Sequence, residues 1–495
     1  MTRSVIFVAS EMFPFSKTGG LGDVIGSLPL ALHRLGVPVS VILPMYRQRV
    51  SRHKIHRSFI DLPVGYPWGP ITADAHLVIY QGMPVYFIER AEYFDRSAYY
   101  NTSKGDYFDN AERFIFFNRA VLSLIRNMGE PAPDIIHVHD WQSAMLPAFV
   151  HYYRQTDPFW SATSTVQTVH NLAFQGRFSS RLFENCGLPP EAWDLNGVEY
   201  FGDLNMLKAG LCYADRITTV SPNYASEILT PEFGYGMDGV LRARRHQLHG
   251  ILNGVNYSVW NPEHNHFLPK PYSAEDLSGK QVCKKALLDE LGMDPALASR
   301  PLFGFIGRLR EQKGIDLLYQ IVPDLMRRNM GVVVLGEGAP RFEEICLEFT
   351  RDYPARFGGV IKYTEALAHR VQAGCDAFLM PSRYEPCGLT QMYAMRFGTP
   401  PLAPDVGGLH DTIIPWPNND ATGFIFKNNT PDELLDTILE AMVIWENNPE
   451  LWREMMLRGM RKDFSWTKSA ESYINLYREL AFDPSRQNGI RSLEF

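Results

Sequence analysis

The most restrictive feature of the sequence is a series of short apolar segments that end abruptly in polar residues. In the first half of the chain they lie at residues 5–9, 37–43, 134–141, 165–169 and 217–220. Strand-like and helix-like segments alternate there, which predicts an open parallel α/β sheet. Ligands of such sheets bind at the carboxyl ends of the strands, so the residues that end these segments are the first candidates for a site.

The segment at residues 17–24 reads Lys-Thr-Gly-Gly-Leu-Gly-Asp-Val and lies between a predicted strand and a predicted helix. Gly19 and Gly20 let the backbone approach a ligand, and the N–H groups at a helix start favour an anion. A tight turn without a ligand is the alternative. Lys17 and Asp23, which flank the glycines, favour a site.

At 495 residues the chain is too long for one core, so two or more domains are expected. The alternating pattern breaks between residues 250 and 300. A second series of predicted strands follows at residues 302–306, 331–335, 360–363, 377–380 and 400–403. Predicted helices lie at 315–326, 432–462 and 467–481. We therefore expect domains at 1–258 and 259–466, and a terminal segment at 467–495 whose tail after residue 482 is polar.

Composition excludes several classes of protein. The net charge of −7 gives no basic surplus for nucleic acid, and no apolar run approaches the ~20 residues that cross a bilayer. The six cysteines show no Cys-x-x-Cys spacing, so neither a zinc site nor a disulfide framework is expected. The chain also lacks a P-loop, a G-x-G-x-x-G turn and a G-x-S-x-G elbow. These features are typical of a cytoplasmic protein with no metal and no membrane partner.

The second half contains three polar clusters that follow predicted strands. Arg308 and Lys313 can converge on one anion, although a solvated loop with ordinary cations is the alternative. Glu385 places a carboxylate at a strand end before Gly388 and a helix start, where its alternative role is a helix cap. The third cluster is the glycine pair at 407–408.

Histidines form the remaining cluster, in the first half. His170 and Asn171 follow the strand at 165–169, where a structural hydrogen bond is the alternative to a catalytic role. His137 and His139 alternate on one strand and share a face, but no third metal ligand is in view, so packing is favoured. Asp140, with the Trp and Gln that follow it, can offer hydrogen bonds and a stacking face to a sugar.

Together these segments resemble the bacterial glycogen synthase and plant starch synthase family over nearly the whole chain. The resemblance rests on residues 17–24, 139–142, 170–171, 251–255, 260–262, 307–309, 312–314, 385–391 and 407–409. It implies a retaining glucosyltransferase with the GT-B fold, in which two Rossmann-like domains face each other across a deep cleft. It also implies ADP-glucose as donor, an α-1,4-glucan such as glycogen as acceptor, and no metal or other cofactor.

The resemblance also implies roles for individual residues. Arg308 and Lys313 clamp the donor diphosphate, Glu385 faces the glucose, and His170 lies near the reacting carbon. The residues it implies in catalysis are His170, Arg308, Lys313, Glu385 and Asp23. The substrate-binding residues it implies are Lys17, Gly19, Gly20, Tyr99, Asp140, Asn171, Asn253, Cys387, Gly388, Leu389, Thr390, Gly407 and Gly408.

The implied reaction is a front-face displacement by the 4-hydroxyl of the glucan end, with ADP released. The final helix is expected to pack on the first domain, with Trp466 and Tyr473 as anchors. Tyr393 stands where many GT-B enzymes carry a second Glu, which the glycogen and starch synthases generally lack. Gly307 and Asn256 replace a common Ser and Asp. Two alternatives stay open: a non-catalytic glucan-binding protein, and a transferase or phosphorylase with another donor.

Overall fold

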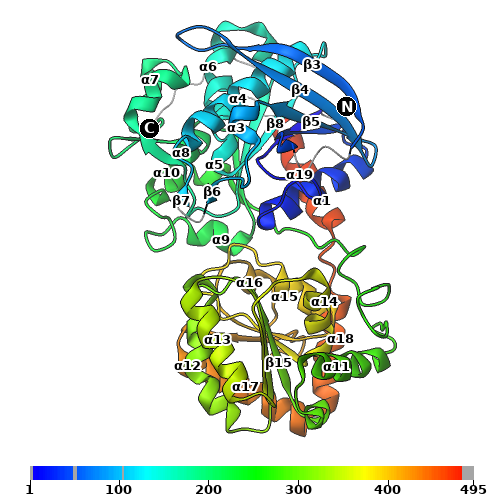
Figure 1. Cartoon of the computed structure of the whole chain (residues 1–495). Helices are drawn as coiled ribbons and strands as arrows, with labels where there is room; N and C mark the ends of the chain where they lie inside the picture. The colour runs from blue at the N-terminus through cyan, green and yellow to red at the C-terminus, as the bar shows by residue number, and fades with distance from the viewer. Residues whose placement is uncertain (1–3, 48–52, 103–104, 482–495) are drawn as a thin grey trace. The chain divides into compact units, whose positions relative to one another are not determined.

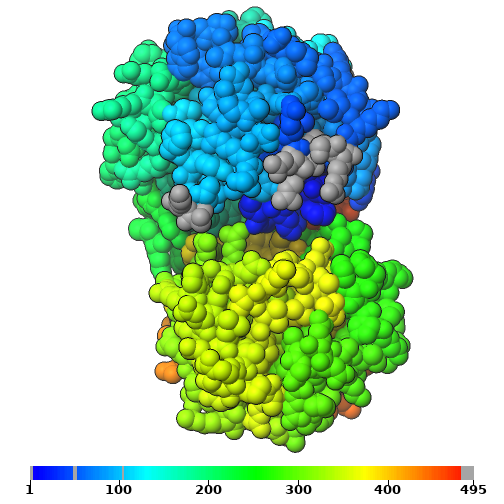
Figure 2. Space-filling view, in the orientation of Figure 1, coloured from blue at the N-terminus to red at the C-terminus, as the bar shows by residue number. Residues whose placement is uncertain are grey.

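The computed structural model describes residues 4–47, 53–102 and 105–481, so the polar tail after residue 482 lies outside the described residues. The chain divides into two compact units, which are described separately (Figure 1). Unit 1 comprises residues 1–254 and 466–495, and unit 2 comprises residues 255–465. The sequence pattern placed the corresponding limits at 258 and 466. In the space-filling view the segments of each unit pack into a continuous body (Figure 2).

Unit 1 is built on a nine-stranded sheet with the order β14-β13-β9-β8-β1-β2-β5-β4-β3. Its strands pair in parallel from β14 to β5, and β4 pairs antiparallel with both β5 and β3. The bounds are β1 (Val5–Val8), β2 (Val39–Pro44), β3 (Ile55–Val64), β4 (Ile71–Tyr80), β5 (Met83–Glu89), β8 (Ile135–His139), β9 (Ser164–Val169), β13 (Arg216–Thr219) and β14 (Leu248–Gly250).

Helices cover both faces of this sheet (Figure 1). Side chains of β1 alternate between two cores, with Ile6 and Val8 on the α4 and α6 side and Val5 and Phe7 on the α1 and α19 side. The helices are α1 (Gly20–Arg34), α3 (Ala91–Phe94), α4 (Asn110–Asn127), α5 (Asp140–Ser143), α6 (Leu146–Thr156), α7 (Phe183–Cys186), α8 (Met206–Tyr213), α9 (Pro222–Glu227), α10 (Asp238–Ala243) and α19 (Trp466–Ala481).

The final helix, α19, lies in unit 1 and packs on α1. Trp466 and Tyr473 are both buried in the core that α1 and α19 share. Short strands complete the unit: β6 (Asn101–Thr102), β7 (Gly105–Asp106), β10 (Arg177–Ser179), β11 (Glu199–Tyr200) and β12 (Asp203–Asn205).

The glycine segment departs from the expected turn. Helix α1 begins at Gly20, with Gly19 as its N-cap, so Gly20 and Gly22 belong to the first helical turn. The preceding loop folds back on this turn, where the Phe13 N–H donates to the Gly22 carbonyl at 2.9 Å. A Cβ at Gly22 would lie 3.1 Å from the Ser16 carbonyl and the Lys17 side chain, so this close approach explains glycine at 22 but not at 20, where nothing lies within 4 Å.

Unit 2 contains a six-stranded sheet, all parallel, with the order β17-β16-β15-β18-β19-β20. The strands are β15 (Leu302–Ile306), β16 (Gly331–Leu335), β17 (Phe357–Val360), β18 (Ala377–Leu379), β19 (Pro401–Pro404) and β20 (Phe424–Phe426). Phe303 and Phe305 face one core, and Leu302 and Ile306 face the other. The helices are α11 (Ser278–Leu291), α12 (Ile315–Met326), α13 (Pro340–Asp352), α14 (Glu365–Gly374), α15 (Thr390–Arg396), α16 (Gly407–Thr412), α17 (Pro431–Asn447) and α18 (Pro449–Arg461).

Two sequence predictions in unit 2 were wrong. The strand expected at 360–363 is β17, which ends at Val360, because Gly358 and Gly359 weaken its apolar pattern. The single helix expected at 432–462 is two helices, since Pro449 cannot continue α17 and Asn448 caps the start of α18. None of the helices in the described ranges is long and apolar enough to cross a membrane.

Candidate active site

The three polar clusters of unit 2 follow strands that are neighbours in the sheet. Strands β15, β18 and β19 pair in sequence, and the loops after them carry residues 307–314, 381–390 and 407–408. Since the strands are parallel, these loops leave the same edge of the sheet. The structure therefore brings together segments that lie up to a hundred residues apart.

The contact at the centre of these loops is an ion pair. Lys313 Nζ lies 2.5 Å from Glu385 Oε2, and the Ser382 hydroxyl donates to the same oxygen at 3.0 Å. Glu385 is nearly buried, with 9% of its side chain exposed, whereas 27% of the Lys313 side chain is exposed. The lysine thus neutralises a desolvated carboxylate while keeping a face open to a ligand.

Two glycines allow this convergence. Gly314 has φ 66°, and a Cβ at this position would overlap the Pro381 carbonyl oxygen. Gly407 has φ 43°, and its Cβ would overlap the Glu385 carbonyl oxygen. Both positions combine a left-handed backbone with a close approach, so any side chain would move one cluster away from another.

The remaining predicted residues of unit 2 surround the ion pair. The Gly408 N–H donates to the Glu385 carbonyl at 3.0 Å. Arg308 is exposed just beyond the end of β15, and the Lys313 side chain runs beside Gly307. Cys387 is buried, and Leu389 is the N-cap of α15, which begins at Thr390.

The sequence analysis included Gln391 in the segment 385–391 but gave it no role, and its side chain ties these loops together. This fully buried amide donates to the carbonyls of Cys387 and Gly388, each at 3.0 Å, and to the Thr412 hydroxyl on α16 at 3.1 Å. It therefore fixes the loop after Glu385 relative to the helix that begins at Gly407. A polar residue within the apolar face of a helix was the available signal.

In unit 1 the predicted residues likewise follow neighbouring strands. Strands β1, β8 and β9 pair in parallel, and their carboxyl ends lead to Glu11, Asp140 and His170. The Asp140 carboxylate accepts the His170 backbone N–H at 2.8 Å, and Asp140 itself has φ 54°. The loops after β8 and β9 are therefore joined by a hydrogen bond.

The loop at residues 17–23 is held by a residue that the sequence analysis did not single out. Glu11 is buried, and its carboxylate accepts hydrogen bonds from the backbone and hydroxyl of Thr18 and from the Tyr100 hydroxyl. Next to it, Lys17 Nζ lies 2.7 Å from Asp23 Oδ1, and both side chains are partly exposed. A charged residue directly after an apolar strand was the signal that could have identified Glu11.

Histidines connect the end of β8 with the end of β9. His139 Nδ1 lies 3.0 Å from His170 Nε2, so His139 contacts a predicted site residue rather than serving only as packing. His137 is hydrogen-bonded to the Tyr477 hydroxyl at 2.7 Å and to the Thr168 hydroxyl at 2.6 Å. The described part of the chain contains no group of three or more His, Cys, Asp or Glu residues that could hold a metal ion.

Three other predicted residues of unit 1 have distinct surroundings. Asn171 Oδ1 accepts the Ala173 N–H in a local turn. Asn253 is buried, and its Oδ1 has no partner among the described residues. The Tyr99 ring packs against Tyr46 with centroids 4.5 Å apart, whereas the hydroxyl of its neighbour Tyr100 reaches Glu11.

Burial controls the ionisation of the groups at this edge. It raises the pKa of Asp140 to about 7, despite backbone N–H groups that lower it, and it lowers the pKa of His170 to about 3. The pKa of Asp23 is also raised by burial, which the neighbouring Lys17 partly offsets. At neutral pH the histidine is therefore uncharged.

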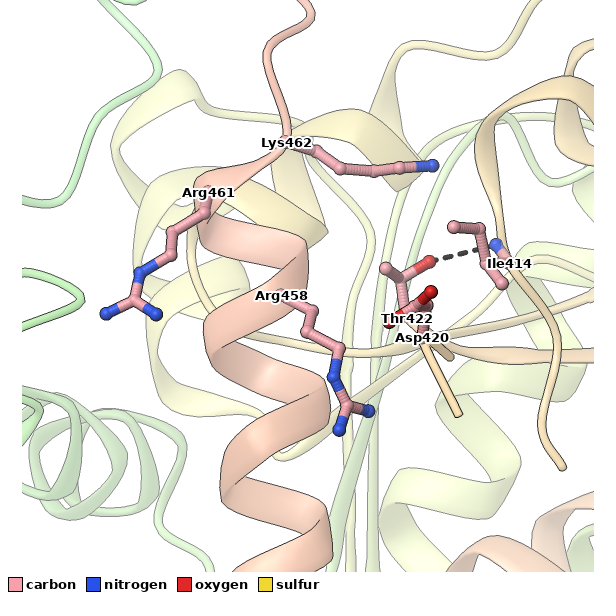
Figure 3. Close-up of a pocket in the computed structure, with 6 residues that line it drawn as sticks. All are labelled: Ile414, Asp420, Thr422, Arg458, Arg461 and Lys462. Atoms are coloured by element: carbon pink, nitrogen blue, oxygen red, sulfur yellow. Dashed lines mark hydrogen bonds between the residues drawn. The ribbon is translucent and has the colours of Figure 1, made fainter. Parts of the chain in front are cut away.

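A separate pocket of unit 2 lies among residues that the sequence analysis did not select (Figure 3). It is lined by Ile414, Asp420, Thr422, Arg458, Arg461 and Lys462. Lys462 extends toward the segment of Ile414 and donates to the Thr412 carbonyl at 2.9 Å, while Arg461 points away from it. Arg458 is paired with Glu454. We therefore assign no catalytic role to this pocket.

Two α/β units with strand-end clusters of cations and carboxylates, and a final helix that belongs to the first unit, are typical of glycosyltransferases of the GT-B class. Comparison with known proteins makes this specific. The family model described as starch synthase catalytic domain matches residues 4–243, and that of glycosyl transferases group 1 matches residues 295–454. The chain belongs to the glycogen and starch synthase family.

Individual relatives match over nearly their full length. The glycogen synthase of Syntrophotalea carbinolica is 41% identical over 480 residues, which cover 96% of this chain and 98% of that protein. The glycogen synthase of an Anaeromyxobacter species is 44% identical over 479 residues, which cover 96% of this chain and 99% of that protein.

Solved structures agree with the fold. The catalytic domain of starch synthase IV from Arabidopsis thaliana, bound to ADP and acarbose, superposes with a TM-score of 0.88. It is 31% identical, and the match covers 97% of this chain and 99% of that one. Sucrose-phosphate synthase from Thermosynechococcus elongatus, 18% identical with a TM-score of 0.59, shares the fold alone.

Proposed function

We propose that the chain transfers glucose from ADP-glucose to the non-reducing 4-hydroxyl end of an α-1,4-glucan with retention of configuration, and that it releases ADP. The two relatives described above, whose matches cover 96% of this chain, are glycogen synthases, which supports this reaction. The observation that carries the proposal is the Lys313–Glu385 pair, because it joins a cation and a carboxylate at the strand-end edge of unit 2.

Unit 2 is the proposed donor side. Arg308 and Lys313 bind the diphosphate, since a guanidinium and an ammonium can share one dianionic group and neutralise the charge that grows as ADP leaves. Glu385 accepts hydrogen bonds from glucose hydroxyls and faces the positive charge that develops on the sugar ring. The backbone of Cys387, Gly388, Leu389, Thr390, Gly407 and Gly408 surrounds the donor.

Unit 1 is the proposed acceptor side. Lys17 and Asp23 meet the glucan end, and His170 lies against the glucose near the reacting carbon. Neutral His170 suits hydrogen bonding to sugar oxygens, because it adds no charge to compete with the donor cations. The other substrate-contacting residues of this side are Gly19, Gly20, Tyr99, Asp140, Asn171 and Asn253.

The proposed chemical step is a front-face displacement at the anomeric carbon. The bond from this carbon to the phosphate oxygen breaks, and a bond to the glucan 4-oxygen forms on the same face. The 4-hydroxyl proton passes to the departing phosphate oxygen, so the step needs no protein nucleophile.

The ADP and acarbose bound to the Arabidopsis starch synthase domain support nucleotide and oligosaccharide binding by this chain. A non-catalytic glucan-binding protein would not need the Lys313–Glu385 pair, and a buried carboxylate is costly to keep without a purpose. The pair therefore favours an enzyme.

One assay tests the proposal. The protein is incubated with glycogen and either ADP-glucose or UDP-glucose, and nucleotide release and glucan extension are measured. We expect release of ADP that depends on glycogen, and much slower release of UDP. Faster turnover of UDP-glucose would overturn the donor assignment. Glycogen binding without nucleotide release would overturn the proposal that the chain catalyses glucose transfer.

A further inference from the structure

The contact between His139 and His170 restricts where both rings carry their protons. Their facing nitrogens, His139 Nδ1 and His170 Nε2, are 3.0 Å apart. Only one proton fits between two imidazole nitrogens at this distance, so one ring donates and the other accepts. Burial lowers the pKa of both rings, so each is neutral and carries a single N–H.

The second nitrogen of His139 decides which ring donates. His139 is fully buried, and its Nε2 has no hydrogen-bond partner among the described residues. If His170 donated, the His139 proton would lie on Nε2 as a buried N–H without an acceptor. Orphaned buried N–H groups are rarer and more costly than an unpaired lone pair. The His139 proton therefore belongs on Nδ1.

The neighbouring rings do not offer an acceptor for an N–H at His139 Nε2. The Phe7 ring is nearly parallel to the His139 ring, at 16° and 5.4 Å, and the His137 ring lies at 30° and 4.3 Å. An N–H in the plane of His139 points along these rings and not into their faces. Both nitrogens of His137 are themselves hydrogen-bonded, Nδ1 with the Tyr477 hydroxyl and Nε2 with the Thr168 hydroxyl, so this ring is held in place.

We propose that His139 is a positioning residue that holds His170 in the tautomer protonated at Nδ1. His139 Nδ1–H donates to His170 Nε2, which leaves the His170 proton on the nitrogen that has no partner among the described residues. At that atom His170 donates a hydrogen bond to a substrate oxygen and cannot act as a base. The role toward substrate rests on the proposed function, whereas the tautomer does not.

The test uses a pair of substitutions of equal size at position 139. In His139→Asn the amide nitrogen lies near the place of Nδ1 and can still donate to His170. In His139→Asp, studied at about pH 8.5 so that a buried carboxyl stays ionised, the carboxylate can only accept, and His170 then places its proton on Nε2. Any cavity is the same in both variants, so a difference between them reports the direction of the hydrogen bond.

The readout is ¹⁵N NMR of the full-length protein labelled on histidine, without substrate, with His170→Gln used to assign the signal. We expect the wild type and His139→Asn to carry the His170 proton on Nδ1, and folded His139→Asp to carry it on Nε2. A wild-type proton on Nε2, or an unchanged tautomer in folded His139→Asp, would overturn the proposal. If neither variant folds, the wild-type spectrum alone decides.

Kinetics extend the test to the reaction. We expect kcat of His139→Asp to fall about 10²-fold below that of His139→Asn, the usual loss when one well-placed donor is removed. The same two substitutions at His249 on β14 are the control and should differ little. Equal kcat at position 139 would overturn the donor role of His170. A correct tautomer in a protein that does not turn over ADP-glucose would instead overturn the proposed function.

Discussion

The two units place their polar clusters at the same point of a sheet but fill that point with different chemistry. In unit 2 an ammonium and a carboxylate are in contact, Lys313 with Glu385. In unit 1 two neutral imidazoles are in contact, His139 with His170. A parallel sheet thus determines where a site forms, and residue type determines its task. Charge in unit 2 suits stabilisation of a leaving group, whereas neutral hydrogen bonds in unit 1 suit orientation of a sugar.

The largest effect should follow removal of charge from unit 2. We expect Lys313→Ala to lower kcat for glucose transfer by about 10³-fold or more, because it removes a phosphate ligand and leaves the buried Glu385 carboxylate without its cation. Glu385→Ala should be similarly severe. Stopped assays of ADP release with glycogen measure both.

Arg327→Ala is the matched control for charge, since Arg327 forms an exposed pair with Asp324 on α12. It should leave turnover within about twofold, as exposed pairs contribute little. Near-normal turnover of folded Lys313→Ala would show that the charge of unit 2 is not needed for transfer, and the contrast with unit 1 would then fail.

The next effect concerns the backbone that brings the charges together. We expect Gly314→Ala to lower kcat about 10²-fold, because a methyl group there meets the Pro381 carbonyl and separates Lys313 from Glu385. Its left-handed conformation adds about 1–2 kcal/mol of strain. Thermal unfolding and turnover are measured together.

Gly292→Ala separates these two contributions. Gly292 has φ 64°, but no atom lies within 4 Å of the place that a Cβ would take, so its substitution adds strain alone. Gly292→Ala should lower the melting temperature only by the amount that backbone strain causes, and it should leave turnover unchanged. Equal turnover of the two variants would show that the approach to Pro381 is unimportant for the site.

Much of the fold follows from apolar periodicity. The strand at 302–306 and the helix at 315–326 were predicted with the bounds that the structure gives. Strand β20 was missed because it has only three residues, and the start of α1 was missed because glycines read as a turn.

The candidate site was predictable only in part. Spacing identified the segments that follow the strands, because the carboxyl ends of parallel strands share an edge. It could not identify the contacts of Glu11 and Gln391 or that of His139 with His170, since these depend on which segments meet in space. The roles of all these residues in the reaction stay predictions.

A smaller effect should follow removal of the charge that unit 1 does carry. We expect Lys17→Ala to lower kcat or raise the apparent KM for glycogen about tenfold, with little change in KM for ADP-glucose. The Lys17–Asp23 pair is partly exposed, with 44% and 32% of the side chains accessible, so it contributes less than about 1 kcal/mol to stability. A loss of activity explained by unfolding would make the loop structural only.

The last effect concerns stability and not turnover: a pH dependence at Asp140. Burial raises the pKa of its carboxyl to about 7 in the folded protein, against about 3.9 in the unfolded chain. The folded state therefore holds the proton more tightly. This contribution to stability is fully present below about pH 4 and is lost as the pH rises through about 7. Asp140→Asn cannot titrate, so the wild-type melting temperature should fall relative to that of the variant across this window.

Melting curves of both proteins at several pH values between about 4 and 8 measure the difference, in which carboxylates common to both proteins cancel. Asn offers one acceptor oxygen, so loss of a hydrogen bond from the backbone N–H of His170 or Asn171 adds an offset that does not vary with pH. Only the slope carries the prediction. A constant difference would mean that Asp140 is ionised throughout, and unit 1 would then present a negative charge beside His170 where the comparison with unit 2 requires neutral groups.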